Sequence, residues 1–222
     1  MVSRSSDSLP TLIVIITGVV WGGYWIPVRA LEATGLTGAW GSFAVVLAAL
    51  CVLAPLALPA FRAGRVPWAS AGVMFLGGFA FIMYSVGFVY GRVAIIILLF
   101  FLTPVWSTLI ARFVMGWATP RLRLYAIGVG LLGLVVMLSA DGSAPIPRSL
   151  GEWLALASGI IWSVATTMMR VTPEIEPKAA AFLFALGSGV FAGVCAPLLA
   201  PFPVDAVQEN GMRMLGLSLI HI

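Results

Sequence analysis

The chain has 222 residues, of which 61% are hydrophobic and only 9% are charged, and its mean hydropathy is +1.10. Soluble domains carry about 25% charged residues, so this composition excludes a soluble globule. The net charge of +4 comes from single basic residues scattered between apolar runs, which form no patch for a nucleic acid. The expected partner is a lipid bilayer, and no nucleic-acid partner is expected.

Long runs without charged residues follow one another along the chain. In chain order they cover 8–28, 33–61, 66–91, 93–111, 124–140, 153–169 and 179–204. A hydrocarbon core about 30 Å thick needs about 20 helical residues, with about 17 as the lower limit. The runs lack the alternation of barrel strands, so they predict an all-α integral membrane protein, a polytopic helical bundle with at least seven transmembrane helices.

The basic residues are divided unequally when they are counted on alternate sides of these spans. The side of the N-terminus holds eight, namely Arg4, Arg62, Arg65, Arg112, Arg121, Arg123, Arg170 and Lys178. The other side holds four, namely Arg29, Arg92, Arg148 and Arg213. The positive-inside rule therefore predicts a cytoplasmic N-terminus.

Groups with the chemistry of an enzyme or a metal site are scarce. Cys51 and Cys195 lie inside apolar runs, and we interpret them as buried thiols that pack as small hydrophobic groups. The only histidine is His221, and no His/Cys/Asp/Glu cluster has metal-site spacing. The GVGLLG stretch at 128–133 matches a dinucleotide motif but lies mid-run, where close helix packing explains it better. No metal, no cofactor and no enzymatic activity are expected.

One pattern occurs twice. The stretch GVVWGGYWIPVR at 18–29 and the stretch GIIWSVATTMMR at 159–170 share a Gly, a Trp and a final Arg at a constant offset of 141 residues. The runs that follow share an Ala-Pro pair at 54–55 and 196–197. This pattern predicts a tandem duplication. Because the two copies lie five spans apart, the second enters the membrane in the opposite direction, as in the inverted repeats of secondary transporters.

Two stretches also carry a family resemblance. One is Trp21-Gly22 with Arg29 eight residues after the Trp; the other is the run 93–138, in which Pro104 precedes a Thr-Pro-Arg turn at 119–121 and a Gly-rich helix. Over about residues 8–201 the chain resembles the drug/metabolite transporter superfamily, in particular its EamA-type permeases. The resemblance implies ten helices in two inverted five-helix repeats, and transport of small metabolites across the bacterial inner membrane. Trp117 departs from the acidic residue that the family often has in this turn.

On this resemblance the first repeat covers 8–140, and the second, 150–222, is incomplete. We therefore expect a C-terminally truncated permease that holds about seven of the ten helices. The tail GLSLIHI at 216–222 would open an eighth span. A homodimer is left open.

The transport path is predicted from helix faces and polar side chains. At about 100° per residue, one face of the first helix carries Gly18, Trp21, Gly22, Trp25 and Arg29, and the counterparts of these residues in the second copy also share one face. The two faces are expected either to pack together or to line a path between them. Pro27 and Pro104 are predicted to bend their helices, either for packing or as hinges. The predicted substrate-binding residues are Trp21, Tyr24, Trp25, Tyr84, Thr103, Ser107, Trp162, Ser163 and Thr166.

The acidic residues bound the apolar runs and do not interrupt them, so no coupling carboxylate is visible; Glu152 is the remaining candidate. Aromatic and hydroxyl groups without buried charge favour a neutral, zwitterionic or amphipathic small-molecule substrate, such as an amino-acid-like metabolite. We therefore expect a secondary transporter that works by alternating access. A channel or a non-transporting scaffold is the alternative, and saturation of the flux with solute concentration distinguishes them.

Overall fold

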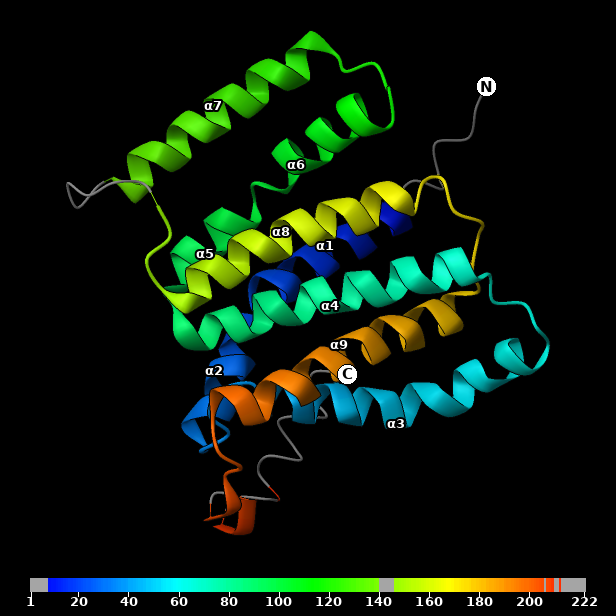
Figure 1. The fold of residues 1–222 in the computed structure, drawn as a ribbon, viewed down its shortest axis with the longest axis vertical. Helices are drawn as coiled ribbons and strands as arrows, with labels where there is room; N and C mark the ends of the chain where they lie inside the picture. The colour runs from blue at the N-terminus through cyan, green and yellow to red at the C-terminus, as the bar shows by residue number, and fades with distance from the viewer. Residues whose placement is uncertain (1–7, 140–145, 206, 210–211, 213–222) are drawn as a thin grey trace.

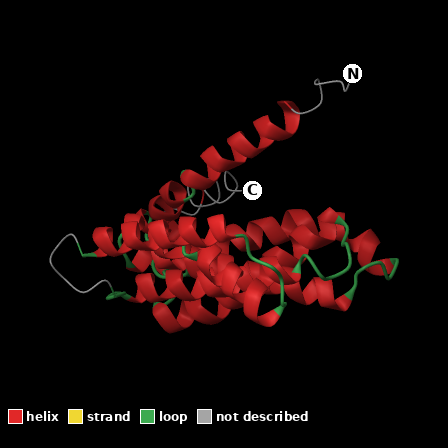
Figure 2. Ribbon diagram, turned by 90° about the horizontal axis from the view of Figure 1, so that it is seen from above, coloured by secondary structure: helices red, strands yellow, loops and turns green. Residues whose placement is uncertain are grey.

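The computed structural model describes residues 8–139, 146–205, 207–209 and 212, and these residues form a helical bundle (Figures 1 and 2). The predicted all-α class is confirmed. The predicted boundary at 140 and the tail 216–222 lie outside the described residues. The helices are α1 (Ser8–Gly22), α2 (Trp25–Ala33), α3 (Trp40–Arg62), α4 (Trp68–Tyr90), α5 (Val93–Phe100), α6 (Thr103–Leu109), the π-helical turn η1 (Ile110–Val114), α7 (Arg121–Leu138), α8 (Leu150–Met168) and α9 (Pro177–Leu199).

The described residues contain six helical segments that are long and apolar enough to cross a membrane, two of them formed by consecutive shorter helices. These are Thr11–Ala33, Trp40–Arg62, Trp68–Tyr90, Val93–Val114, Arg121–Leu138 and Pro177–Leu199. The chain is thus a polytopic helical membrane protein. The remaining predicted span, 153–169, coincides with α8, which has 19 residues but falls below the hydropathy of the other six. The reason is its content of Glu152, Ser and Thr.

Helix α4 is the centre of the bundle, with α8 and α9 packed along it; α3 packs against α9, and α5 and α6 pack against α8 (Figure 1). Glycine makes these close approaches possible. A Cβ atom on Gly78 would lie 2.7 Å from the carbonyl carbon of Phe184, and one on Gly187 would lie 2.8 Å from that of Phe75. At the crossing of α4 and α8, a Cβ atom on Gly151 would lie 2.7 Å from the amide nitrogen of Gly91.

Helices α1 and α7 lie at the periphery, and α1 leaves the bundle in Figure 2. A Cβ atom on Gly18, on Gly22 or on any glycine of 128–133 would meet no atom within 4 Å. The prediction that the glycines of 128–133 pack closely against another helix is therefore wrong for this structure, and close packing, one of the two alternatives for Gly18 and Gly22, is not seen either. Cys51 was predicted to be buried, but it is exposed on the outer side of α3, whereas Cys195 is half-buried.

The two ends of the bundle differ in charge. The α3–α4 and α8–α9 connections meet at one end, where Arg65 lies 3.6 Å from Glu176. The start of α7 and the end of α8 lie at this same end (Figure 1), which collects most of the described basic residues. At the opposite end, Arg92 lies 3.7 Å from Glu152. The basic residues thus segregate between the two ends as the alternating count assumes.

Candidate functional site

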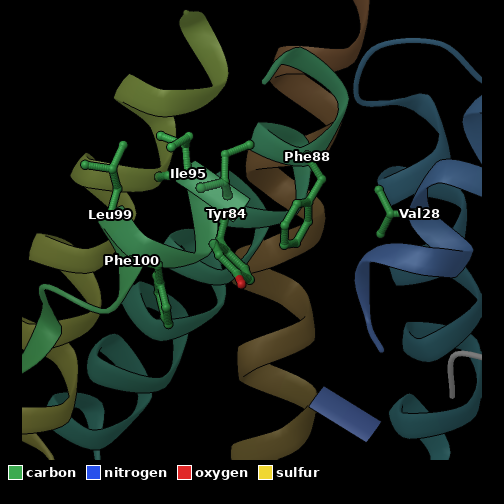
Figure 3. Packing of buried hydrophobic residues seen from close by; sticks show 8 residues of the cluster. Val28, Tyr84, Phe88, Ile95, Leu99 and Phe100 are labelled. Carbon is green, nitrogen blue, oxygen red and sulfur yellow. The ribbon is translucent and has the colours of Figure 1, made fainter. Parts of the chain in front are cut away.

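Aromatic side chains form a continuous series of ring contacts through the bundle, with centroids 4.4 to 6.2 Å apart. Pairs at such distances attract each other by about 0.5 to 1.5 kcal/mol beyond the effect of area burial. Figure 3 shows Tyr84 with Phe88 and Phe100 on either side. We call this set the aromatic cluster; its members are Trp21, Tyr24, Phe81, Tyr84, Phe88, Phe100, Trp162 and Phe184.

Part of the aromatic cluster forms a circuit that crosses four helices and returns to α4. From α4 the contacts run from Phe81 to Phe184 of α9 at 5.6 Å, and from Phe184 to Trp162 of α8 at 6.1 Å. They continue from Trp162 to Phe100 of α5 at 6.2 Å, and from Phe100 to Tyr84 at 4.4 Å. Because Phe81 and Tyr84 are three residues apart on α4, the circuit returns to the face on which it began.

The two tryptophans of the sequence repeat do not touch each other. Trp21 stands 5.7 Å from Phe81, and Trp162 stands 6.1 Å from Phe184, so these phenylalanines bridge them. Trp21 remains 38% exposed at the edge of the aromatic cluster. Trp25 packs at the side of the apolar core that surrounds Phe88.

A chain of hydroxyl groups adjoins the aromatic cluster. The Tyr24 hydroxyl lies 3.0 Å from Ser85 Oγ, which lies 2.9 Å from Ser42 Oγ. The three groups come from the α1–α2 junction, α4 and α3, and both serines are buried. A hydroxyl group buried in a membrane protein without a partner is costly, so this chain fixes the phenol of Tyr24 in place.

Hydroxyl groups also join α8 to α6. Ser163 Oγ donates to the carbonyl of Gly159 at 2.7 Å and lies 3.1 Å from the carbonyl of Thr103. Thr166 Oγ1 donates to the carbonyl of Trp162 at 2.8 Å. Ser163 is fully buried, so it is placed between the helices, whereas Thr103 and Thr166 reach a pocket.

This pocket has a volume of about 210 Å³ and lies between α6, η1, the α7 start and the α8 end. It brings together three predicted residues, Thr103, Ser107 and Thr166. Arg123 reaches across it, with its guanidinium nitrogen 3.4 Å from Ser107 Oγ. We call this the arginine pocket; its other polar lining residues are Trp117, Thr119, Thr167 and Arg170.

The aromatic cluster and the arginine pocket share one face of α8. Trp162 and Thr166 are four residues apart on α8, so they lie one above the other on this face, and Arg170 follows in the turn just after the helix ends at Met168. At about 1.5 Å of rise per residue, the backbone positions of Trp162 and Thr166 are about 6 Å apart along the axis. A polar end and an aromatic end therefore adjoin along one helix.

Two segments of membrane-spanning length are broken close to these groups. α1 ends at Gly22, and α2 begins at Trp25, with Pro27 as its third residue. Proline has no backbone N–H, so Pro27 cannot donate a hydrogen bond to the carbonyl of Gly23. That carbonyl instead accepts a hydrogen bond from the amide of Ile26 at 3.0 Å.

The second break lies between α5 and α6, and Pro104 is the second residue of α6. The carbonyl of Phe100, four residues before this proline, accepts a hydrogen bond from Thr103 Oγ1. Each proline thus follows a helix break, and the carbonyl that it leaves free has another donor. Whether these breaks act as hinges stays a prediction.

Glu152 is buried at the start of α8, where local structure accounts for its charge. Ser149 Oγ accepts from the amide of Glu152 at 3.2 Å, which caps the helix. The carboxylate accepts from the amide of Arg148 at 2.8 Å and lies 3.7 Å from Arg92 Nε. These contacts are typical of a helix cap and an ion pair, so they give no support to a coupling role for Glu152.

Sequence reasoning missed several members of the site. Phe81 and Phe184 complete the aromatic circuit, but in an apolar run their pattern does not differ from that of lipid-facing phenylalanines. Ser42 and Ser85 are small polar residues within spans, and that feature was the available signal. Arg123 was counted only for topology, although its place at the start of α7 brings it to Ser107.

We compared the chain with protein-family models, with curated proteins and with solved structures, and none of them matches it. The family resemblance of the sequence motifs therefore stays a prediction. The proposed function rests on the geometry of the aromatic cluster, the arginine pocket and the helix breaks.

Proposed function

We propose that the chain belongs to a secondary transporter that moves small metabolites across a membrane by alternating access. The observation that carries this proposal is the pair of broken spans beside the aromatic cluster. Transporters commonly build substrate sites where membrane helices are interrupted, because backbone polar groups become available there. A bundle that serves only as a membrane anchor gains nothing from such breaks.

The sequence motifs support a finer version of the proposal. On the resemblance to EamA-type permeases, the chain would be a multi-pass protein of the bacterial inner membrane with its N-terminus in the cytoplasm. In Figure 1, α1 and α8, which carry the Gly and the first Trp of the two repeated stretches, run in opposite directions. This arrangement is in keeping with inverted repeats. The basic end of the bundle would then face the cytoplasm.

The aromatic cluster is the proposed contact for the apolar part of the solute. Trp162 lies at its centre, is half-buried, and stands on the face of α8 that leads to the arginine pocket. An amino-acid-like or amphipathic solute fits this combination of rings and polar groups. A channel or a scaffold would have no need of a fixed aromatic contact.

The test is transport by the complete product of the gene that encodes this chain, in membrane vesicles, with radiolabelled amino acids as the probe. Flux should saturate with concentration. Trp162→Ala should raise the half-saturating concentration about three- to tenfold, because an aromatic contact contributes about 0.5 to 1.5 kcal/mol. Leu12→Ile, an exchange on the exposed surface of α1, is the matched control and should leave transport unchanged. Linear, unsaturable flux would favour a channel, and unaltered transport by Trp162→Ala would refute the site.

A further inference from the structure

We propose that the arginine pocket binds an oxyanion, the carboxylate or phosphate group of a small molecule. This goes beyond the transport proposal, because binding at this pocket can be measured without any flux. It also differs from the expectation, drawn from the sequence, of a path without charge.

The pocket carries positive charge without a counter-charge. Arg123 and Arg170 both line it, and no acidic side chain does. Among the described residues, the ion pairs within 4.0 Å involve other arginines, namely Arg29, Arg65 and Arg92. Both arginines are exposed, and an anion between the two guanidinium groups would remove the repulsion that solvent leaves unscreened.

The start of α7 adds to this positive potential. This helix has 18 residues, its N-cap is Pro120 without a side-chain hydrogen bond, and its first turn contains no acidic residue. A helix N-terminus carries a partial positive charge, and basic residues in the first turn are unfavourable there. Arg121 and Arg123 nevertheless occupy that turn. An anion at the pocket would offset the charges of Arg123 and Arg170 and the partial charge of the helix N-terminus.

The hydroxyl groups of the pocket complement this charge. Thr167, which is 4% exposed, lines the pocket, and so does Thr119. Hydroxyl and guanidinium donors around one small volume are the groups that bind carboxylate and phosphate oxygens. A volume of about 210 Å³ admits such a group with a few further atoms.

The experiment measures how an anion protects single arginines from phenylglyoxal, with the modified peptides quantified by mass spectrometry. The chain is held in a neutral maltoside detergent in a chloride buffer, and inorganic phosphate or acetate is added. Saturating phosphate should slow the modification of Arg123 and Arg170 about fivefold or more. Arg112, exposed at the same end but outside the pocket, is the internal control and should change little. Equal protection of Arg112, or no protection of the two pocket arginines, would overturn the proposal.

Variants sharpen the result. Arg170→Gln should weaken the protection of Arg123 by phosphate about tenfold, because a charge-assisted contact is lost, whereas Arg112→Gln should not. Arg170→Lys keeps the charge and should keep part of the protection, which separates anion binding from a general structural change. Unchanged protection of Arg123 in Arg170→Gln would refute the shared site.

Vesicles identify the source of the oxyanion. In phosphatidylcholine vesicles, protection that requires added phosphate or acetate assigns the pocket to a dissolved anion. Protection without any added anion in vesicles that contain phosphatidylglycerol assigns it to a lipid headgroup. Both outcomes support an oxyanion site, and loss of protection in every vesicle refutes it. Failure of this binding leaves the transport test untouched.

Discussion

The closest approach between α4 and α9 allows a stringent test of the fold. Gly78→Ala adds a methyl group that would lie 2.7 Å from the carbonyl carbon of Phe184 and 3.0 Å from the amide nitrogen of Ser188. Carbon atoms in contact are normally about 3.5 to 4.0 Å apart, so the two helices must separate by about 1 Å. The separation also strains the hydrogen bond of 2.8 Å that Ser188 Oγ donates to the carbonyl of Gly78.

We expect the free energy of unfolding to fall by about 1 to 3 kcal/mol from overpacking, with about 0.6 kcal/mol more from the weakened hydrogen bond. The measurement is unfolding in mixed micelles with a rising fraction of dodecyl sulfate, followed by circular dichroism. Gly72→Ala on the same helix is the matched control, since its new methyl group would meet nothing within 4 Å. Alanine there should be neutral or stabilise the helix by up to about 1 kcal/mol. If both variants unfold at the same detergent fraction, the packing of α4 against α9 is wrong.

Two further predictions concern the hydroxyl chain and the ends of the bundle. In a double-mutant cycle of Tyr24→Phe and Ser85→Ala, the unfolding free energies should show a coupling of about 0.6 kcal/mol, the average for membrane hydrogen bonds, and additive effects would contradict the contact. In a chain whose two native cysteines are replaced by alanine, Thr119→Cys should resist a membrane-impermeant thiol reagent added to intact cells while Arg148→Cys is labelled. The reverse pattern would overturn the proposed orientation.

The lengths of the main helices were predictable from charge alone. The runs 33–61, 66–91 and 179–204 correspond to α3, α4 and α9, although α3 begins only at Trp40, because the exclusion of charge from lipid determines where a span can lie. The interruptions inside 8–28 and 93–111 were harder to locate. Proline indicates that a carbonyl loses its partner, but the site of the break depends on which donor replaces it, and that is a property of the packed structure.

The pairing of helices was not predictable in the same way. Lipid and protein interior are equally apolar, so hydropathy does not separate a packed face from a lipid face. For this reason the glycines of 128–133 and those at 78 and 187 looked alike in sequence, although only the latter pair lies at a helix crossing. The aromatic circuit was partly visible, since Trp162 and Tyr84 were predicted, but its bridging phenylalanines depend on tertiary contacts.

The arginines change what the site can recognise. A residue at the end of a charge-free run is outside the span in a linear reading, and that reading left Arg123 out of the path, although Arg170 was placed on the predicted face as the counterpart of Arg29. In the bundle, the breaks and the π-helical turn bring the end of the α5–α6 segment under the start of α7, so that Arg123 meets Ser107. Charge at a membrane end thus shares a pocket with hydroxyl groups from within the spans. A solute with an apolar body and an oxyanion would match both ends of this face of α8, whereas a purely neutral solute would leave the guanidinium groups uncompensated.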